Sequence, residues 1–266
     1  MLRFSPANAK LQALKNVPEL KSFLSGKRKV FSFDLLSGWT CPFASECLAK
    51  VEVITVNGIK TKKLKDGKDA HIRCFSASQE VIYTNVYNMR KANTDLIRKE
   101  QSVAGMATLI NESLPVNAGI IRIHVAGDFL NQNYFDAWLS VALNNPDILF
   151  YAYTKSLPYW VNNIAIIPDN MILTASKGGR ADHMIEQYNL RSVIVVNSNY
   201  QAKKLKLKVD HTDECAARPK LKHKDFALLI HGIQKAGTKA AKAISRMKKG
   251  NIKFSYNRKD TFKKAA

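Results

Sequence analysis

Four cysteines are the residues of this sequence best suited to chemistry: Cys41, Cys47, Cys74 and Cys215. Thiolates are soft ligands that select zinc or iron–sulfur clusters among the common metals. A [4Fe–4S] cluster takes a cysteine at each of its irons, and a structural zinc site takes four ligands, so the count suits both. We expect a [4Fe–4S] cluster held by all four residues, with zinc as the alternative. Four unrelated thiols are the remaining interpretation.

The spacing of the cysteines requires loops that are distant in sequence to meet. Five residues separate Cys41 from Cys47, 26 separate Cys47 from Cys74, and a long gap precedes Cys215. Zinc ribbons use tight, repeated pairs, and ferredoxins use compact runs. The C-x3-C-x2-C triplet of radical S-adenosylmethionine enzymes is also absent. If all four cysteines bind the cluster, no iron stays open for that cofactor; His211 is the spare ligand if one does not.

The N-terminal segment indicates the compartment of the protein. The N-terminus lacks the apolar region of a secretory signal, and no segment approaches the roughly 20 apolar residues of a membrane span. We expect a short polar helix there, no membrane span, and a cytoplasmic protein. Cysteines in a reducing compartment serve metals or catalysis more often than disulfides.

Apolar strands alternate with amphipathic helices and must position these residues. The predicted strands are Lys29–Leu36, Gly119–Phe129, Ile148–Ser156, Asn170–Gly179 and Ser192–Ser198. Nearly continuous apolar strands separated by helices are typical of a parallel sheet that is covered on both faces. The prediction is a single α/β domain over residues 1–266, built as an incomplete parallel (β/α) barrel.

Three further segments complete the predicted domain. A β-hairpin insertion spans residues 50–74, with arms at Val51–Val56 and His71–Cys74 around Asn57-Gly58 and Asp66-Gly67. Apolar residues at three- and four-residue steps predict mostly helix from Ser78 to about Glu112. The same periodicity predicts a basic amphipathic helix from Lys224 to about Lys248.

Polar residues end the predicted strands and form a second candidate site. In parallel α/β folds the carboxyl ends of the strands face the ligand. The residues at those ends are Gly127, Asp128, Thr154, Lys155, Ser176, Lys177 and Arg180. Asp128 would either bind a ligand or cap the helix that begins near Asn131. The stretch from Ser176 to Arg180 would suit a phosphate cradle, or simply a common strand-to-helix loop.

Positive charge is concentrated near the C-terminus. The chain carries a net charge of +21, and residues 200–266 hold 19 Lys and Arg against five Asp and Glu. Such a field attracts polyanions. We expect this Lys-rich region to contact nucleic acid or an acidic protein, although no known nucleic-acid-reading motif is present.

Several stretches in order resemble a known family. TCPFASEC, RCFSASQE, RIHVAGDF, FYAYTKS, MILTASKGGRAD and DECAARP are similar to the phage-encoded gene product 88 family, whose members resemble a reduced radical S-adenosylmethionine barrel. The resemblance implies that Cys41, Cys47, Cys74 and Cys215 are cluster ligands. It also implies that Gly127 and Asp128 lie where the radical enzymes hold their cofactor.

Three functions are consistent with these features. The first is a redox or electron-transfer protein that docks an acidic partner. The second is a nucleic-acid-binding protein with a structural or redox-sensing cluster, or with structural zinc in its place. The third is a radical-enzyme-like protein that acts on S-adenosylmethionine or a nucleotide.

Overall fold

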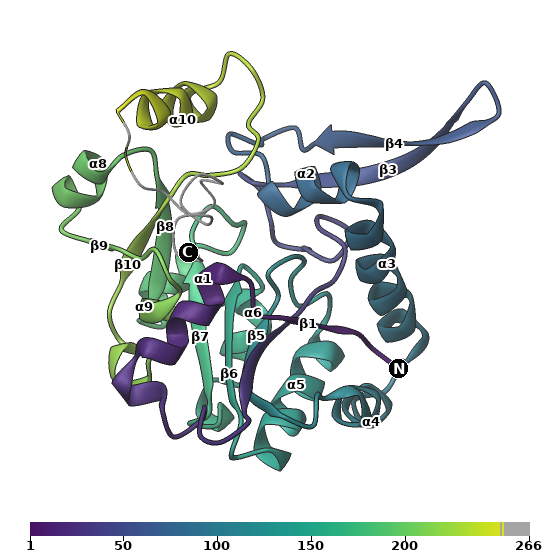
Figure 1. The fold of residues 1–266 in the computed structure, drawn as a ribbon, viewed down its shortest axis with the longest axis vertical. Coiled ribbons are helices and arrows are strands. Elements are labelled where there is room, and N and C mark those ends of the chain that lie inside the picture. The colour runs from purple at the N-terminus through teal and green to yellow at the C-terminus, as the bar shows by residue number, and fades with distance from the viewer. Residues whose placement is uncertain (251, 253–266) are drawn as a thin grey trace.

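The computed structural model describes residues 1–250 and residue 252 and contains an eight-stranded sheet (Figure 1). In spatial order the strands are β1 (Phe4–Pro6), β2 (Lys29–Phe33), β5 (Ala118–Ile123), β6 (Leu149–Thr154), β7 (Met171–Ser176), β8 (Ser192–Val196), β10 (Phe226–Leu229) and β9 (Lys208–Val209). Strand β1 is antiparallel to β2, and every other pairing in this sheet is parallel. The predicted α/β class with a mostly parallel sheet is confirmed.

The sheet is open rather than closed. Its strand order ends at β1 on one side and at β9 on the other, and these two edges do not pair within the described part of the chain. The structure therefore confirms the parallel sheet of the predicted incomplete barrel but shows no barrel closure.

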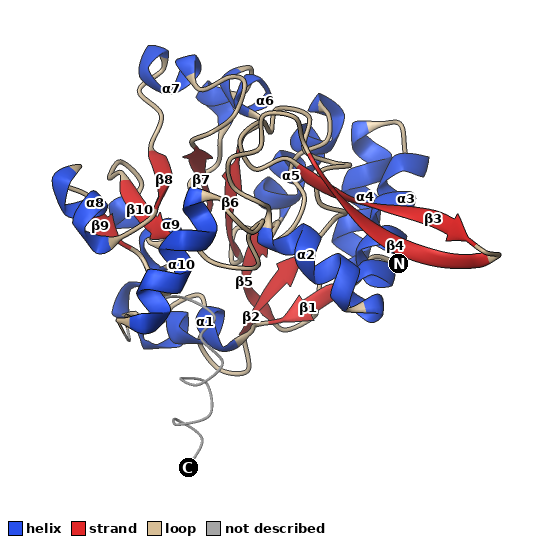
Figure 2. Ribbon diagram, turned by 90° about the horizontal axis from the view of Figure 1, so that it is seen from above, coloured by secondary structure: helices blue, strands red, loops and turns tan. Residues whose placement is uncertain are grey.

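Helices cover both faces of this sheet (Figure 2). Ile121 and Ile123 of β5 point to the face where Trp138 of α5 (Gln132–Asn144) packs, together with α4 (Val103–Ser113). Ile120, just before them, points to the opposite face, where Leu11 of α1 (Ala9–Gln12) packs. That face is also covered by η1 (Ala13–Asn16), η2 (Pro18–Leu20) and α9 (Glu214–Ala217). Alternate residues of one strand thus serve two separate cores.

Further helices follow the later strands of the sheet. They are α6 (Leu157–Val161), η3 (Ile164–Ile166), α7 (His183–Gln187), α8 (Asn199–Lys204), η4 (Pro219–Leu221) and α10 (Lys239–Lys249). Helices α8 and α10 bury a third apolar cluster against β8 and β10. Within the described residues, no helix combines the length and hydropathy of a membrane-crossing segment.

The hairpin insertion exists, but its second arm differs from the predicted one. Strand β3 (Ala49–Val56) pairs with β4 (Ile59–Asp66) through a turn at Asn57 and Gly58. Both turn residues have positive φ, at 50° and 77°, which matches the twist that two-residue hairpins require. The predicted arm at His71–Cys74 was wrong, because residues 59–66 already complete the ladder. Residues 71–74 instead lead into the next helix.

The prediction of mostly helix from Ser78 to about Glu112 is confirmed, whereas the predicted helix from Lys224 to Lys248 was partly wrong. The stretch from Ser78 to Glu112 is divided into α2 (Phe75–Ile82), α3 (Thr84–Lys99) and α4. The predicted helix from Lys224 to Lys248 is strand β10 followed by α10. A short apolar run satisfies both helical and strand periodicity, and Gly232 and Gly237, both at positive φ, separate the two elements. The predicted N-terminal helix is likewise preceded by strand β1.

Candidate metal centre

Three of the four cysteines line one cavity at the carboxyl edge of the sheet. The cavity has a volume of about 200 Å³, and Cys41, Cys47 and Cys74 contribute to its wall. The remaining wall comes mainly from residues at or just beyond the carboxyl ends of β5, β6, β7 and β10. Of the predicted rim residues, Gly127, Asp128, Thr154, Lys155 and Ser176 line it, whereas Lys177 and Arg180 do not.

Backbone contacts fix the loop that carries Cys41 and Cys47. The Gly38 amide donates to the Cys41 sulfur at 3.4 Å, and Gly38 itself has φ of 71°. A Cβ on Gly38 would lie 2.5 Å from the Ala49 carbonyl oxygen, so glycine permits this close approach. Farther along, the Glu46 amide donates to the Gly178 carbonyl at 3.0 Å. The loop is therefore held against the loop after β7.

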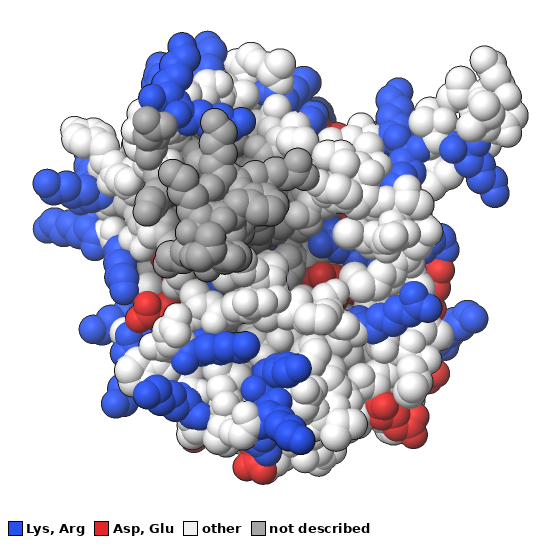
Figure 3. All heavy atoms as spheres, in the orientation of Figure 1, with Lys and Arg blue, Asp and Glu red and all other residues white. Residues whose placement is uncertain are grey.

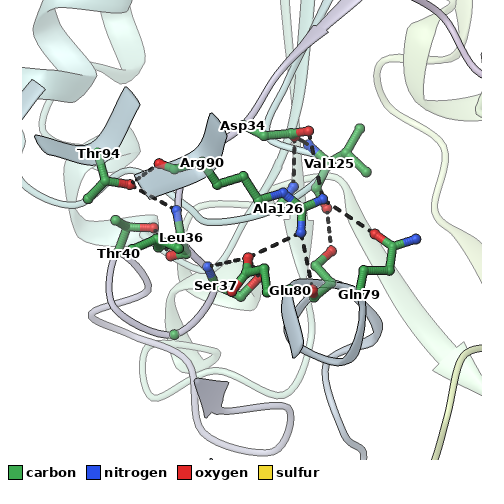
Figure 4. Close-up of polar contacts among 12 residues, drawn as sticks. Asp34, Leu36, Ser37, Thr40, Gln79, Glu80, Arg90, Thr94, Val125 and Ala126 are labelled. Carbon is green, nitrogen blue, oxygen red and sulfur yellow. Dashed lines mark hydrogen bonds and ion pairs between the residues drawn. The ribbon is translucent and has the colours of Figure 1, made fainter. Parts of the chain in front are cut away.

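Cys74 enters the same cavity from the start of a helix. It is the N-cap residue of α2, and its side chain makes no capping hydrogen bond. Six residues later, the Glu80 carboxylate accepts from the Ser37 amide at 3.0 Å and from the Ser37 hydroxyl at 2.8 Å (Figure 4). Because Ser37 begins the turn that leads to Cys41, Glu80 ties two cysteine-bearing segments together.

A buried arginine extends this connection to the sheet. The Arg90 guanidinium on α3 donates to Glu80 at 3.1 Å and lies 3.8 Å from the Asp34 carboxylate (Figure 4). Asp34 in turn accepts from the amides of Val125 and Ala126, at 2.8 and 3.0 Å. The network thus joins the ends of β2 and β5 to α2 and α3. Sequence reasoning missed it, because neither Glu80 nor Arg90 departs from an ordinary helical pattern.

The electrostatics of the thiols also place three cysteines together. Burial raises the pKa of Cys41 well above its usual range, and the nearby Asp128 and Cys74 raise that pKa further. Burial raises the pKa of Cys47 to about 11, an effect that Lys155 opposes and Cys74 reinforces. Because a metal ligand must be the thiolate, a bound cation is what would stabilise that form at these half-buried thiols.

Asp128 acts at the rim and is not a helix cap. Its carboxylate accepts from the Thr154 hydroxyl at 2.6 Å and from the amides of Lys155 and Phe129, each at 2.8 Å. Helix α5 is capped instead by Asn131, which accepts from the Tyr134 amide. Burial raises the pKa of Asp128 to about 6, although these hydrogen bonds lower it.

The predicted phosphate cradle is already filled by protein groups. The amides of Gly178 and Gly179 donate to the two carboxylate oxygens of Asp182, at 2.7 and 2.9 Å. The Lys155 ammonium donates to the carbonyls of Ser176 and Lys177, at 2.6 and 2.5 Å. The loop therefore uses these donors to hold its own shape, which favours the strand-to-helix interpretation.

Cys215 is placed apart from the other three cysteines. It lies on α9, between β9 and β10, and packs in the apolar cluster on the face covered by α1. Its amide donates to Asp210 at 2.9 Å, and its carbonyl accepts from Arg191 at 3.0 Å. It does not line the cavity. The prediction that all four cysteines are ligands remains untested, but the structure brings only three of them to one place.

The cavity also holds a buried ionic cluster that sequence reasoning did not identify. Asp213, which is fully buried, accepts from Lys10 at 2.7 Å, from Arg122, and from the hydroxyls of Tyr151 and Tyr153 at 3.2 and 3.3 Å. These partners keep the pKa of Asp213 low, at about 2, despite its burial. A charged Arg122 inside an apolar strand was the one available signal. His124, at φ of 66°, lies beside this cluster and bonds to the Tyr134 hydroxyl at 3.0 Å.

The donor set suits an iron–sulfur cluster in kind. No three His, Cys, Asp or Glu side chains among the described residues stand close enough to hold a single metal ion. A cluster distributes its thiolates over several irons, so its ligands surround a group of atoms rather than one ion. Three thiols around a cavity of about 200 Å³ fit that requirement.

Comparison with known proteins identifies the family. The family model described as "Gene product 88" matches residues 2–250. The "Gene 88 protein" of Mycobacterium phage L5 is 26% identical over 127 residues, which is 44% of each chain. The chain thus aligns with less than half of the length of that relative. No solved structure matches the chain. Because the family model spans nearly all of the described residues, the chain belongs to the gene product 88 family.

Proposed function

We propose that this chain binds a [4Fe–4S] cluster through Cys41, Cys47 and Cys74. The observation that supports this most strongly is their convergence on one cavity, although they come from two ends of a loop and from the start of α2. Cys215, which lies on α9 in the apolar cluster with Leu11 and Ile120, takes no part in this proposal.

The chain's own residues have distinct tasks in the proposed site. The three thiolates hold the cluster, which when bound accepts and donates single electrons. Lys155 places positive charge near Cys47, and Asp128 anchors the backbone of Lys155. Glu80 and Arg90 hold the two cysteine-bearing segments in fixed positions relative to each other.

A site with three cysteines favours an enzyme over a simple electron carrier. Three protein thiolates leave one of the four irons without a cysteine, whereas four would leave none. The fold supports this reading, because the cysteine loop follows β2, and Gly127 and Asp128 follow its neighbour β5. A radical-enzyme-like use of S-adenosylmethionine is therefore the second candidate, and it predicts 5′-deoxyadenosine on reduction. If an active, reduced preparation forms none, this candidate fails.

The partner predicted for the C-terminal region also remains a proposal. Lys and Arg side chains gather over α8 and α10 on the face shown in Figure 3. Residues 251 and 253–266 of the predicted Lys-rich region lie outside the described residues. An acidic protein or a nucleic acid would suit this charge.

Anaerobic purification with iron, sulfide and zinc analysis tests the main proposal. We expect about four irons and four sulfides per chain, with visible absorbance that dithionite bleaches reversibly. The triple variant Cys41→Ala/Cys47→Ala/Cys74→Ala should be colourless yet folded by circular dichroism. A colourless wild-type protein with stoichiometric zinc would refute cluster binding and support the zinc alternative.

A further inference from the structure

The β3–β4 hairpin projects beyond the rest of the molecule (Figures 1 and 2). Its base is firmly attached: the Arg73 guanidinium contacts Asp66 at 2.5 and 2.8 Å, and the Trp39 indole donates to the Val51 carbonyl at 2.8 Å. A two-stranded hairpin alone is marginally stable in water. Lys62 adds a further contact, because its ammonium donates to the Glu80 carbonyl at 2.8 Å. These contacts hold the hairpin, while the residues around its turn stay exposed.

Lysines line this hairpin along most of its length. Strand β4 carries Lys60, Lys62, Lys63 and Lys65. Lys65 lies directly opposite Lys50, a like-charge pair that destabilises a sheet, and Glu52 is shared between them at 3.3 and 3.5 Å. The strand alternation places Lys60 and Lys63 on opposite faces, and both are exposed. Lysines thus lie on both faces of the hairpin, and they outnumber its acidic residues.

The end of the hairpin is apolar and exposed. Val56 is 48% exposed and Ile59 is 69% exposed, and they face each other across the Asn57-Gly58 turn. Exposed apolar side chains at the tip of a charged ribbon gain nothing for the fold. Such side chains are known to wedge between base pairs in proteins that bend DNA.

We propose that the β3–β4 hairpin is an arm that binds duplex DNA. A two-stranded ribbon fits a groove of B-DNA, and lysines on both faces reach the phosphates on either side of that groove. Ile59 and Val56 then contact the base pairs. A second copy of the hairpin is a poor partner, because the lysines of the two copies would repel each other. An anionic membrane would use the tip but not the lysines spread along β4. This inference is independent of the proposed cluster.

The test compares two variants that lose the same charge. One is Lys60→Gln/Lys63→Gln/Lys65→Gln on the hairpin, and the other is Lys21→Gln/Lys27→Gln/Lys29→Gln, from the end of η2 to the start of β2, where all three lysines are also exposed. Binding to a fluorescent 30-base-pair duplex is measured by anisotropy over a range of salt. We expect the slope of log Kd against log salt to fall by about 2 to 3 for the hairpin variant, since each phosphate contact contributes about 0.9. The variant of Lys21, Lys27 and Lys29 should keep the wild-type slope.

A second variant separates the tip from the lysines. Ile59→Ser should weaken binding by a similar factor at every salt concentration and leave the slope unchanged, because it removes no charge. Equal melting temperatures of all variants would show that the fold is intact. The inference is refuted if wild-type protein does not bind the duplex, or if the hairpin variant loses no more affinity than the variant of Lys21, Lys27 and Lys29. Binding to anionic vesicles with no binding to the duplex would also overturn it.

Discussion

Replacing Asp213 by asparagine tests whether the ionic cluster beside the cavity holds the fold together. The carboxylate joins Lys10 of α1, Arg122 of β5 and two tyrosines of β6, so it connects the N-terminal helix to the inside of the sheet. An asparagine keeps the shape but removes the charge. Lys10 and Arg122 would then be two buried cations without their shared anion.

The expected loss in the free energy of unfolding is about 3 to 5 kcal/mol, the usual cost of removing one partner from a buried ion pair. The pH dependence gives a second measure. The pKa of Asp213 is lowered to about 2, so its stabilisation is complete above the unfolded value near 4 and is lost as pH falls towards 2. The stability difference between wild type and variant should hold from pH 7 to 5 and narrow below pH 4.

Urea denaturation followed by circular dichroism measures both quantities. Asp169→Asn is a matched control, because Asp169 pairs with Lys222 at 3.2 Å but is 99% exposed. This control should unfold at the wild-type urea concentration. An Asp213→Asn protein as stable as the control would show that the cluster is not a structural element.

Three further substitutions test other parts of the account. Arg90→Met should lower the free energy of unfolding by about 3 to 5 kcal/mol and reduce the iron content per chain, because Glu80 and Asp34 lose their cation. Full iron content in a folded variant would contradict the role of Arg90 in positioning the cysteines. Gly127→Ala should lower the melting temperature, since its φ is 85° and a Cβ would lie 2.7 Å from the Thr40 hydroxyl; an unchanged melting curve would count against this close packing. Burial lowers the pKa of His124 to about 3, so stability is lost as pH falls below the unfolded value near 6.5. Between pH 7 and 5, the free energy of unfolding measured by urea titration should therefore fall by about 2 kcal/mol less in His124→Gln than in the wild type. Equal falls would show that His124 does not cause this pH dependence.

Local patterns predicted the parts of the fold that depend on local physics. The buried strands around Ile121, Phe150 and Leu173 appear where the apolar runs indicate them, because both faces of a parallel strand are covered. The run at Phe226–Leu229 was misassigned, since a four-residue strand next to a helix has no period of its own. Its pairing with β8, which is distant in sequence, decides its conformation.

In the candidate site, too, local sequence predicts some positions, and contacts between distant segments decide the others. Cys41, Cys47 and Cys74 follow β2 closely enough that their convergence is set by one strand, one loop and one hairpin. The position of Cys215 depends on β9 and β10, which the sequence does not distinguish from helix, so its distance from the cavity was not predictable. The partners of Asp213 lie far apart in sequence, and only the folded chain reveals them.

The most direct test of the central claim compares single cysteine variants purified anaerobically. Cys74→Ala removes a thiol from the cavity wall, whereas Cys215→Ala removes one from the apolar cluster beside α9. The account predicts that Cys215→Ala retains the wild-type iron, sulfide and visible absorbance, and that Cys74→Ala loses most of each. Loss of the cluster in Cys215→Ala to the same extent as in Cys74→Ala would contradict a centre held by Cys41, Cys47 and Cys74 alone.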